Sequence, residues 1–260
     1  MSPEQFKALA DQGYNRIPVM REVLADLDTP LSTYLKLAHE PYTYLFESVQ
    51  GGEKWGRYSI IGLPSNTLLK VVGRTVTIET AGKVMETHEV EDPLAFIETY
   101  QQQFRVPELP DLPRFTGGLV GYFGYDIVRY IEKRLDEGAR KHSKPDPIGT
   151  PDILLMLSDD VVVFDNLRGS LFAVTHVDPA TNDAYNSAQA RIDQLIEKLK
   201  QPTRHPDPGP SRDVSESDFK SGFEQPDFEQ SVDAIKDYVL AGDVMQVVIS
   251  QRMTIPFDGP

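Results

Sequence analysis

The sequence predicts an α+β protein: a largely antiparallel, sandwich-like sheet with covering helices, followed by the beginning of a second module. Short runs rich in β-branched and aromatic residues, separated by Gly-containing turns, predict the strands. Three segments with apolar residues at helical spacing predict the covering helices. A proline-rich, polar stretch after residue 200 predicts where the first domain ends.

The elements follow in chain order. Thr29-Pro30 predicts an N-cap and the start of a short helix. From Pro41 the period changes to two, and YTYLFES, RYSIIG, TLLKVVG, TVTIET and KVMETHE predict an antiparallel meander with one solvated face. Asp92-Pro93 predicts a second capped helix. GGLVGYF and DILLMLSDDVVVFDNLRGSLFAVTHV predict further strands, with a hairpin turn at 166–169, and TNDAYNSAQARIDQLIEKLK predicts an amphipathic helix.

The same patterns predict the domain organisation. Residues 1–200 are expected to form one domain, 201–217 a linker, and 218–260 the beginning of a second domain. In this last part, PDFEQSVDAIKDYVLAGD predicts a helix with Asp227 as its cap and Gly242 just past its end, and VMQVVISQRMTI predicts a long strand. One helix and one strand cannot bury a core of their own. We therefore expect the second domain to be incomplete in these 260 residues.

Composition excludes several classes of partner and site. The 40 acidic residues against 26 basic ones give a net charge of −14, which repels nucleic acid and anionic membrane surfaces. With no cysteine, the chain has neither disulfides nor thiolate metal ligands. The first residues lack the apolar core of a signal peptide, and no run approaches the ~18 apolar residues of a membrane span. A cytoplasmic protein is expected.

The familiar catalytic and phosphate-binding motifs are absent. The glycines of GGLVGYFGYD are not followed by Lys-Ser or Lys-Thr and do not form G-x-G-x-x-G, so we expect them to allow close backbone packing. The histidines are scattered and do not have the spacing of metal ligands. The residues alone therefore predict no catalytic residue and no metal ligand.

One stretch, YLFESVQGGEKWGRYSIIG, has a more specific pattern. Its first strand ends in an acid and a hydroxyl, Glu47 and Ser48, and a tight turn returns Arg57 in the next strand. A hairpin brings these three groups to one end of the sheet, where they could meet the ammonium and carboxylate of a free amino acid. The alternative is a strand that simply ends in solvent.

Three motifs resemble one known family. LFES…GGEKWGRYSIIG, GGLVGYFGYDIVR and AGDVMQVVISQR are similar, in that order, to motifs of anthranilate synthase component I, the chorismate-using subunit of tryptophan biosynthesis. The resemblance implies a subunit about twice this length. The family's catalytic histidine and its acid–base and Mg²⁺-binding glutamates would then lie beyond Pro260.

The resemblance also implies a reaction and a regulatory site. The family converts chorismate and ammonia to anthranilate and pyruvate with Mg²⁺, and a partner glutamine amidotransferase supplies the ammonia. The family's Glu-Ser pair lines the feedback site for tryptophan, which implies that Glu47 and Ser48 bind tryptophan. Arg57 stands where the family often has Lys, and Phe46 replaces the usual Leu.

The residue at one position, 246, distinguishes this chain from related chorismate-using enzymes. Isochorismate and salicylate synthases use water and carry a general-base Lys where this chain has Gln246, in the substrate pocket that the resemblance implies. An amide cannot deprotonate water, whereas ammonia needs no base. Aminodeoxychorismate synthase remains an alternative, although it typically reads QVN where this chain reads QVV. The 260 residues by themselves are expected to be inactive, as a module that binds an amino acid and docks to other subunits.

Overall fold

The computed structural model describes residues 1–24, 27–50, 54–110, 113, 115–132, 134–135, 146, 148–203 and 213–257. The chain divides into two compact units, Met1–Arg204 and His205–Pro260. Most of the expected linker, residues 204–212, lies outside the described residues.

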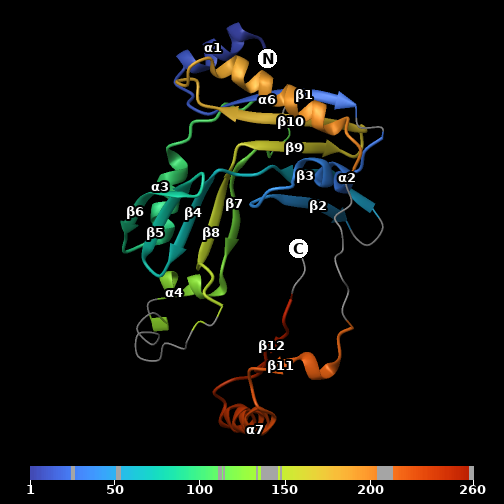
Figure 1. Ribbon diagram of the computed structural model, residues 1–260. Coiled ribbons are helices and arrows are strands. Elements are labelled where there is room, and N and C mark those ends of the chain that lie inside the picture. Colours follow the sequence, from blue (N-terminus) through green and yellow to red (C-terminus); the bar gives the residue numbers. More distant parts are fainter. Residues whose placement is uncertain are drawn as a thin grey trace. The chain divides into compact units, whose positions relative to one another are not determined.

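In the described part of the first unit, the strands form two five-stranded antiparallel sheets (Figure 1). The first sheet has the order β1 (Ile17–Leu24), β10 (Ser170–Val177), β9 (Asp160–Asp165), β3 (Lys54–Gly62) and β2 (Tyr44–Gln50). The second sheet has the order β6 (Lys83–Glu89), β5 (Thr75–Thr80), β4 (Thr67–Val72), β8 (Ile153–Ser158) and β7 (Gly118–Phe123). The expected mixed fold with antiparallel sheets is therefore confirmed.

The expected meander is divided between these sheets, so its predicted connectivity is wrong. β3 pairs with β2 and β9, whereas β4 pairs with β5 and β8. The chain leaves the first sheet just before Pro64, which has no N–H to donate to a further ladder. The chain returns through a single residue, Asp159, between β8 and β9.

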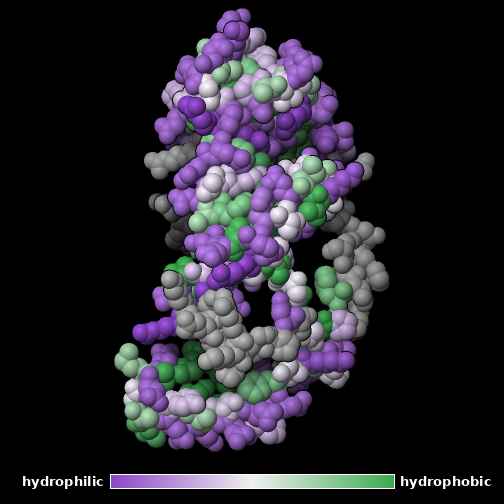
Figure 2. Space-filling model, turned by 90° about the vertical axis from the view of Figure 1, so that its left-hand side faces the viewer, coloured by the Kyte–Doolittle hydropathy of each residue, from purple (hydrophilic) through white to green (hydrophobic). Residues whose placement is uncertain are grey.

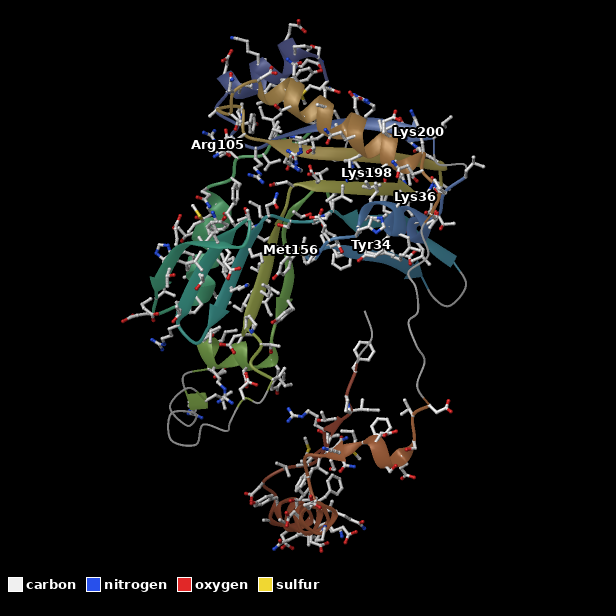
Figure 3. The ribbon with its side chains drawn as sticks, viewed as in Figure 1. Tyr34, Lys36, Arg105, Met156, Lys198 and Lys200 are labelled. Carbon is white, nitrogen blue, oxygen red and sulfur yellow. The ribbon has the colours of Figure 1, made fainter. Side chains whose placement is uncertain are left out.

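Three helices cover the first sheet: α1 (Pro3–Asp11), α2 (Pro30–Leu37) and α6 (Ala184–Leu199). The apolar side of α6 packs Ala188 and Ile192, both fully buried, against the sheet core. Lys36 on α2 donates to the carbonyl oxygen of Leu199 at 2.9 Å and so satisfies an acceptor in the last turn of α6 (Figure 3). One face of this sheet is therefore closed by helices.

The second sheet packs against α3 (Pro93–Gln102), and Ile97 joins a core with residues of β4, β5 and β8. The predicted cap is confirmed, because Asp92 accepts hydrogen bonds from the N–H groups of Leu94 and Ala95. After β7, the chain forms a short 3₁₀ turn, η1 (Tyr125–Ile127), and a single turn of α-helix, α4 (Val128–Ile131).

The second unit contains η2 (Glu216–Asp218), β11 (Lys220–Ser221), α7 (Gln225–Ala241) and β12 (Met253–Thr254). The predicted helix is confirmed and ends at Gly242 in the left-handed conformation, but its cap is Glu224, with Asp227 in the first turn. The prediction of a long strand in VMQVVISQRMTI is wrong, since only the two residues of β12 form a strand there, and they pair with β11. A strand needs a sheet to pair with, and the described part of this unit offers only two residues.

The surface is mainly hydrophilic on the face that can be seen in Figure 2. Apolar residues form scattered patches on this face. Across the ranges that the structure describes, no helix is long and apolar enough to span a membrane.

Candidate functional site

Glu47 and Ser48 lie on β2, an outer strand of the first sheet. Both residues are exposed, and the preceding Phe46 is 50% exposed. Leu45 packs against the helix-covered core. Because side chains alternate along a strand, Glu47 shares the face of Leu45, and Ser48 shares the face of Phe46. A ligand that contacts both polar groups must therefore sit across the edge of β2.

The strand opposite Ser48 bulges. Glu47 pairs with Ser59 and Val49 pairs with Trp55, so residues 56–58 of β3 face the single residue Ser48. Bulges bend a strand and redirect its side chains, and they are frequent beside functional sites. Arg57 lies in the middle of this bulge.

Gly56, the first residue of the bulge, lies very close to Ser48 of β2. A Cβ at this position would overlap the side chain and the carbonyl oxygen of Ser48. Residue 56 must therefore lack a side chain for Ser48 to keep its place. This contact gives a physical reason for the first glycine in GRYSIIG.

Arg57 makes an ion pair across the sheet with Asp165, the last residue of β9. Its Nη2 and Nε donate to Oδ2 of Asp165 at 2.9 and 3.2 Å. Its guanidinium also lies 4.8 Å from the ring centre of Tyr58. The expected grouping of this guanidinium with Glu47 and Ser48 stays a prediction, and part of the intervening turn, residues 51–53, lies outside the described residues.

The Asp165 carboxylate is 2% exposed, whereas the Arg57 side chain is 46% exposed. Burial opposes ionisation of Asp165, but hydrogen bonds from Arg57 and from the N–H groups of Arg168 and Leu167 outweigh it and lower its pKa. No local pattern predicts this contact, since the two partners are 108 residues apart along the chain.

A cavity of about 300 Å³ opens beside this ion pair. Its lining combines the charged side chains of Glu22, Arg57, Asp165 and Arg168 with the aromatic rings of Tyr58 and Phe172. Charged groups of both signs beside aromatic rings are suited to a small zwitterion with an apolar part.

A second polar cluster lies where the chain passes from β8 to β9. Arg16 forms an ion pair with Asp159, and His176 contacts the carbonyl oxygen of Asp159 through Nδ1 at 3.2 Å and the hydroxyl of Thr116 through Nε2 at 3.3 Å. Burial, with the nearby charge of Arg16, lowers the pKa of His176 to about 4. This neutral, hydrogen-bonded histidine supports the corner between the sheets, and sequence reasoning missed it.

The glycine motif has the structural role expected from the sequence. A Cβ at Gly117, Gly121 or Gly124 would overlap a backbone carbonyl oxygen, from Ser158, Leu154 and Asp152 respectively. The prediction of close backbone packing is confirmed at these positions.

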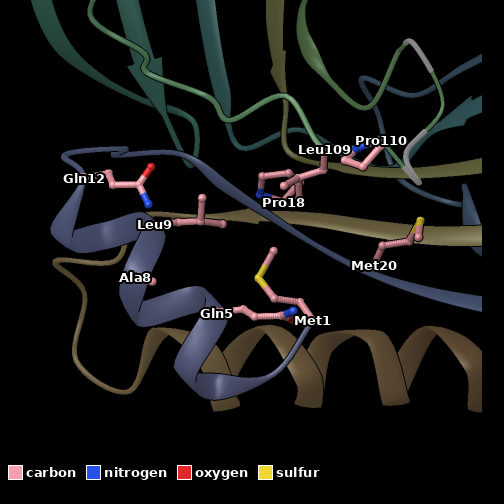
Figure 4. A pocket seen from close by; sticks show the side chains of 9 residues that line it. All are labelled: Met1, Gln5, Ala8, Leu9, Gln12, Pro18, Met20, Leu109 and Pro110. Carbon is pink, nitrogen blue, oxygen red and sulfur yellow. The ribbon is translucent and has the colours of Figure 1, made fainter.

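A further cavity, of about 430 Å³, lies between α1, β1 and the loop at residues 109–110 (Figure 4). The side chains around it are apolar or amides. These side chains offer packing and amide hydrogen bonds, but none of them carries a charge to meet an ammonium or a carboxylate.

Gln246 belongs to the second unit, where it is exposed and lies outside the short strand β12. In the described parts of both units, no group of three or more His, Cys, Asp or Glu side chains could hold a metal ion. The Mg²⁺ implied by the resemblance therefore finds no fitting ligand set among these residues.

A family model described as chorismate binding enzyme matches residues 43–260, which include both the β2–β3 hairpin and the second unit. The chain belongs to this family of chorismate-binding enzymes. The match extends from the start of β2 to the end of the chain.

Three similar proteins are each named anthranilate synthase component 1. The protein from Pseudomonas putida is 55% identical over 99% of this chain and 52% of its own length. The protein from Neisseria meningitidis serogroup B is 48% identical over 100% and 52%, and that from Aquifex aeolicus 38% over 100% and 51%. The chain thus spans about half the length of the curated relatives it matches, and the resemblance inferred from the three motifs is confirmed.

A crystal structure of anthranilate synthase component I from Streptococcus pneumoniae TIGR4 aligns with a TM-score of 0.56. The alignment covers 92% of this chain and 49% of that one, at 24% sequence identity. This likeness shows the shared fold.

Proposed function

We propose that this chain is part of an anthranilate synthase component I. The proposed reaction takes chorismate and ammonia to 2-amino-2-deoxyisochorismate and then, with loss of pyruvate, to anthranilate, at the start of tryptophan biosynthesis. The observation that carries the proposal is the identity of 55% over 99% of the chain to a relative of that name. A glutamine amidotransferase is the proposed partner and source of ammonia.

The proposed role of the β2–β3 hairpin is to bind tryptophan as a feedback inhibitor. An amino acid carries an ammonium, which suits the Glu47 carboxylate, and a carboxylate, which suits the Ser48 hydroxyl and a guanidinium. Support comes from the exposure of Glu47 and Ser48 and from the half-exposed guanidinium of Arg57. The aromatic side chain of the ligand has apolar neighbours in Phe46 and Tyr58.

The side chain of Gln246, in the second unit, favours ammonia as the nucleophile. Gln246 has an amide, which has no basicity near neutral pH and cannot activate water. Ammonia is already a nucleophile and needs no such base. Bound Mg²⁺ would hold the substrate carboxylate, and the described residues of this chain do not provide its ligands.

The test is an assay of the component I polypeptide that carries this chain, with chorismate, Mg²⁺ and ammonium, read by anthranilate fluorescence. Anthranilate formation supports the proposal. Formation of 4-amino-4-deoxychorismate, detected as p-aminobenzoate after addition of its lyase, would instead assign the chain to aminodeoxychorismate synthase. The 260-residue polypeptide alone should give no signal above a boiled control.

A further inference from the structure

The turn between β9 and β10 is built on Asp165. Its carboxylate accepts hydrogen bonds from the N–H groups of Leu167 and Arg168, and its carbonyl oxygen accepts from Gly169 N–H at 2.9 Å. These bonds form a closed turn in which the next residue, Asn166, is held in one place. The turn itself was expected from the sequence, but its contact with the bulge of β3 was not.

Asn166 reaches from this turn to the bulge of β3. Its backbone N–H donates to the carbonyl oxygen of Arg57 at 2.8 Å. Its side-chain Nδ2 donates to the carbonyl oxygen of Gly56 at 3.0 Å and contacts the Ser59 hydroxyl at 3.2 Å. The side chain thus connects the two ends of the bulge, whose residues do not follow the regular ladder with β2.

The bulge in turn limits where Ser48 can lie. Gly56 touches the side chain and the backbone oxygen of Ser48 so closely that no Cβ fits between them. A shift of Gly56 therefore moves Ser48 or opens a gap beside it, because packed groups at contact distance transmit displacement.

We infer that Asn166, supported by Asp165, is a positioning residue that sets the place of Ser48 through the β3 bulge, and so tunes the affinity of the site for an aromatic amino acid. The inference rests on the proposed function, since it assigns the regulation of that same site to a turn about a hundred residues further along the chain. Asn166 acts through Gly56 and does not itself touch the ligand.

The test replaces the amide donor with an acceptor of the same shape. Asn166→Asp cannot donate to Gly56, so the half-inhibitory tryptophan concentration should rise about tenfold, as expected for a lost, well-aligned hydrogen bond that holds a contact in place. The matched control is Asn186→Asp, the same chemical change at a helix residue whose amide bonds only Asp183 in the described contacts. It should leave inhibition unchanged. An unchanged inhibitory concentration in Asn166→Asp, with the wild type inhibited, would overturn the inference.

Amide hydrogen exchange separates positioning from general stability. Asn166→Asp should speed exchange at residues 56–59 of β3 while amides in the second sheet keep their wild-type protection. Uniform acceleration over both sheets, or no change at residues 56–59, would overturn the inference. If tryptophan does not inhibit the wild type, the proposed regulatory function fails, and the exchange result alone decides whether Asn166 positions the bulge.

Discussion

Asp165 binds the guanidinium of Arg57 from a position that is 2% exposed, while nearly half of the Arg57 side chain remains in solvent. Removal of the buried Asp165 carboxylate should therefore lower stability. The Arg57 guanidinium is partly in solvent, so water can hydrate it when the ion pair is broken. The ion pair joins the end of β9 to the bulge of β3, beside the proposed inhibitor site.

Removal of the Asp165 charge should make the free energy of unfolding depend less on pH. Asp165→Asn keeps the shape but not the charge, and should lower the free energy of unfolding at pH 7 by about 1–2 kcal/mol. The folded-state pKa of Asp165 is lowered, so its contribution is present above its ordinary value of 3.8 and is lost as pH falls through the lower folded value. Urea unfolding should thus show a gap between variant and wild type at pH 7 that narrows near pH 3.

The control for that variant is Asp126→Asn. Asp126 also pairs with an arginine, Arg129, but both side chains are well exposed. Exposed pairs contribute little, so this change should stay within about 0.5 kcal/mol. An equal effect of both variants would contradict the distinction between the two ion pairs.

Gly56→Ala should distort the bulge. The new methyl group would overlap Ser48, and insertion of a methyl into a packed site costs about 1–3 kcal/mol. Gly222→Ala is the matched control, since its nearest neighbour, the carbonyl oxygen of Arg252, lies at an ordinary 3.6 Å. Chemical denaturation measures both, and a cost at Gly56 no larger than at Gly222 would contradict the close approach.

His176 should make the protein less stable as the solution becomes mildly acidic. Its pKa is about 4 in the folded state against 6.5 ordinarily, because burial and Arg16 disfavour the charged ring. The unfolded chain therefore takes up the proton first, and stability falls between pH 6.5 and about 4, by up to ~3 kcal/mol. His176→Gln should show a shallower fall in unfolding free energy over this range; a slope as steep as that of the wild type would contradict the assignment.

The two long helices should differ in local stability. α6 buries four side chains, whereas α7 buries none among the described residues. Amides of α7 should therefore exchange with solvent faster than those of α6 by orders of magnitude, since local protection follows burial. Equal protection in the 260-residue polypeptide would show that α7 is covered.

Local patterns in the sequence predicted most elements of the fold. Period-two runs identified β2 to β6, and Asp92-Pro93 identified α3, because alternation and caps are properties of neighbouring residues. The strand β1 was not predicted. The helix α1 was missed although Ser2 and Gln5 form a capping box around Pro3, a signal that the sequence does contain. The strand predicted after α7 was wrong although the local pattern favoured it, because a strand also needs a partner strand to pair with.

The site shows the same limit. Glu47 and Ser48 could be selected because an acid and a hydroxyl end an apolar strand, which is a local pattern. The ion pair of Arg57 with Asp165 and the hydrogen bond from Asn166 to Gly56 each join residues about 110 positions apart. Both contacts depend on the strand order β2-β3-β9. No spacing in the sequence encodes that order.

Tryptophan inhibition of the component I polypeptide that carries Ser48→Phe tests directly whether the β2–β3 hairpin binds the inhibitor. Phenylalanine would fill the space that the ligand needs and remove a hydroxyl worth about 1 kcal/mol or more. Because Ser48 is exposed, the ring can extend into solvent and away from Gly56, so the change should cost stability within about 0.5 kcal/mol. Inhibition requires tryptophan to bind one state better than another, so loss of the contact removes inhibition and spares the chemistry. We predict near-normal anthranilate synthesis with a half-inhibitory tryptophan concentration raised about tenfold or more. Unchanged inhibition would contradict the account and leave Glu47 and Ser48 as a strand that ends in solvent.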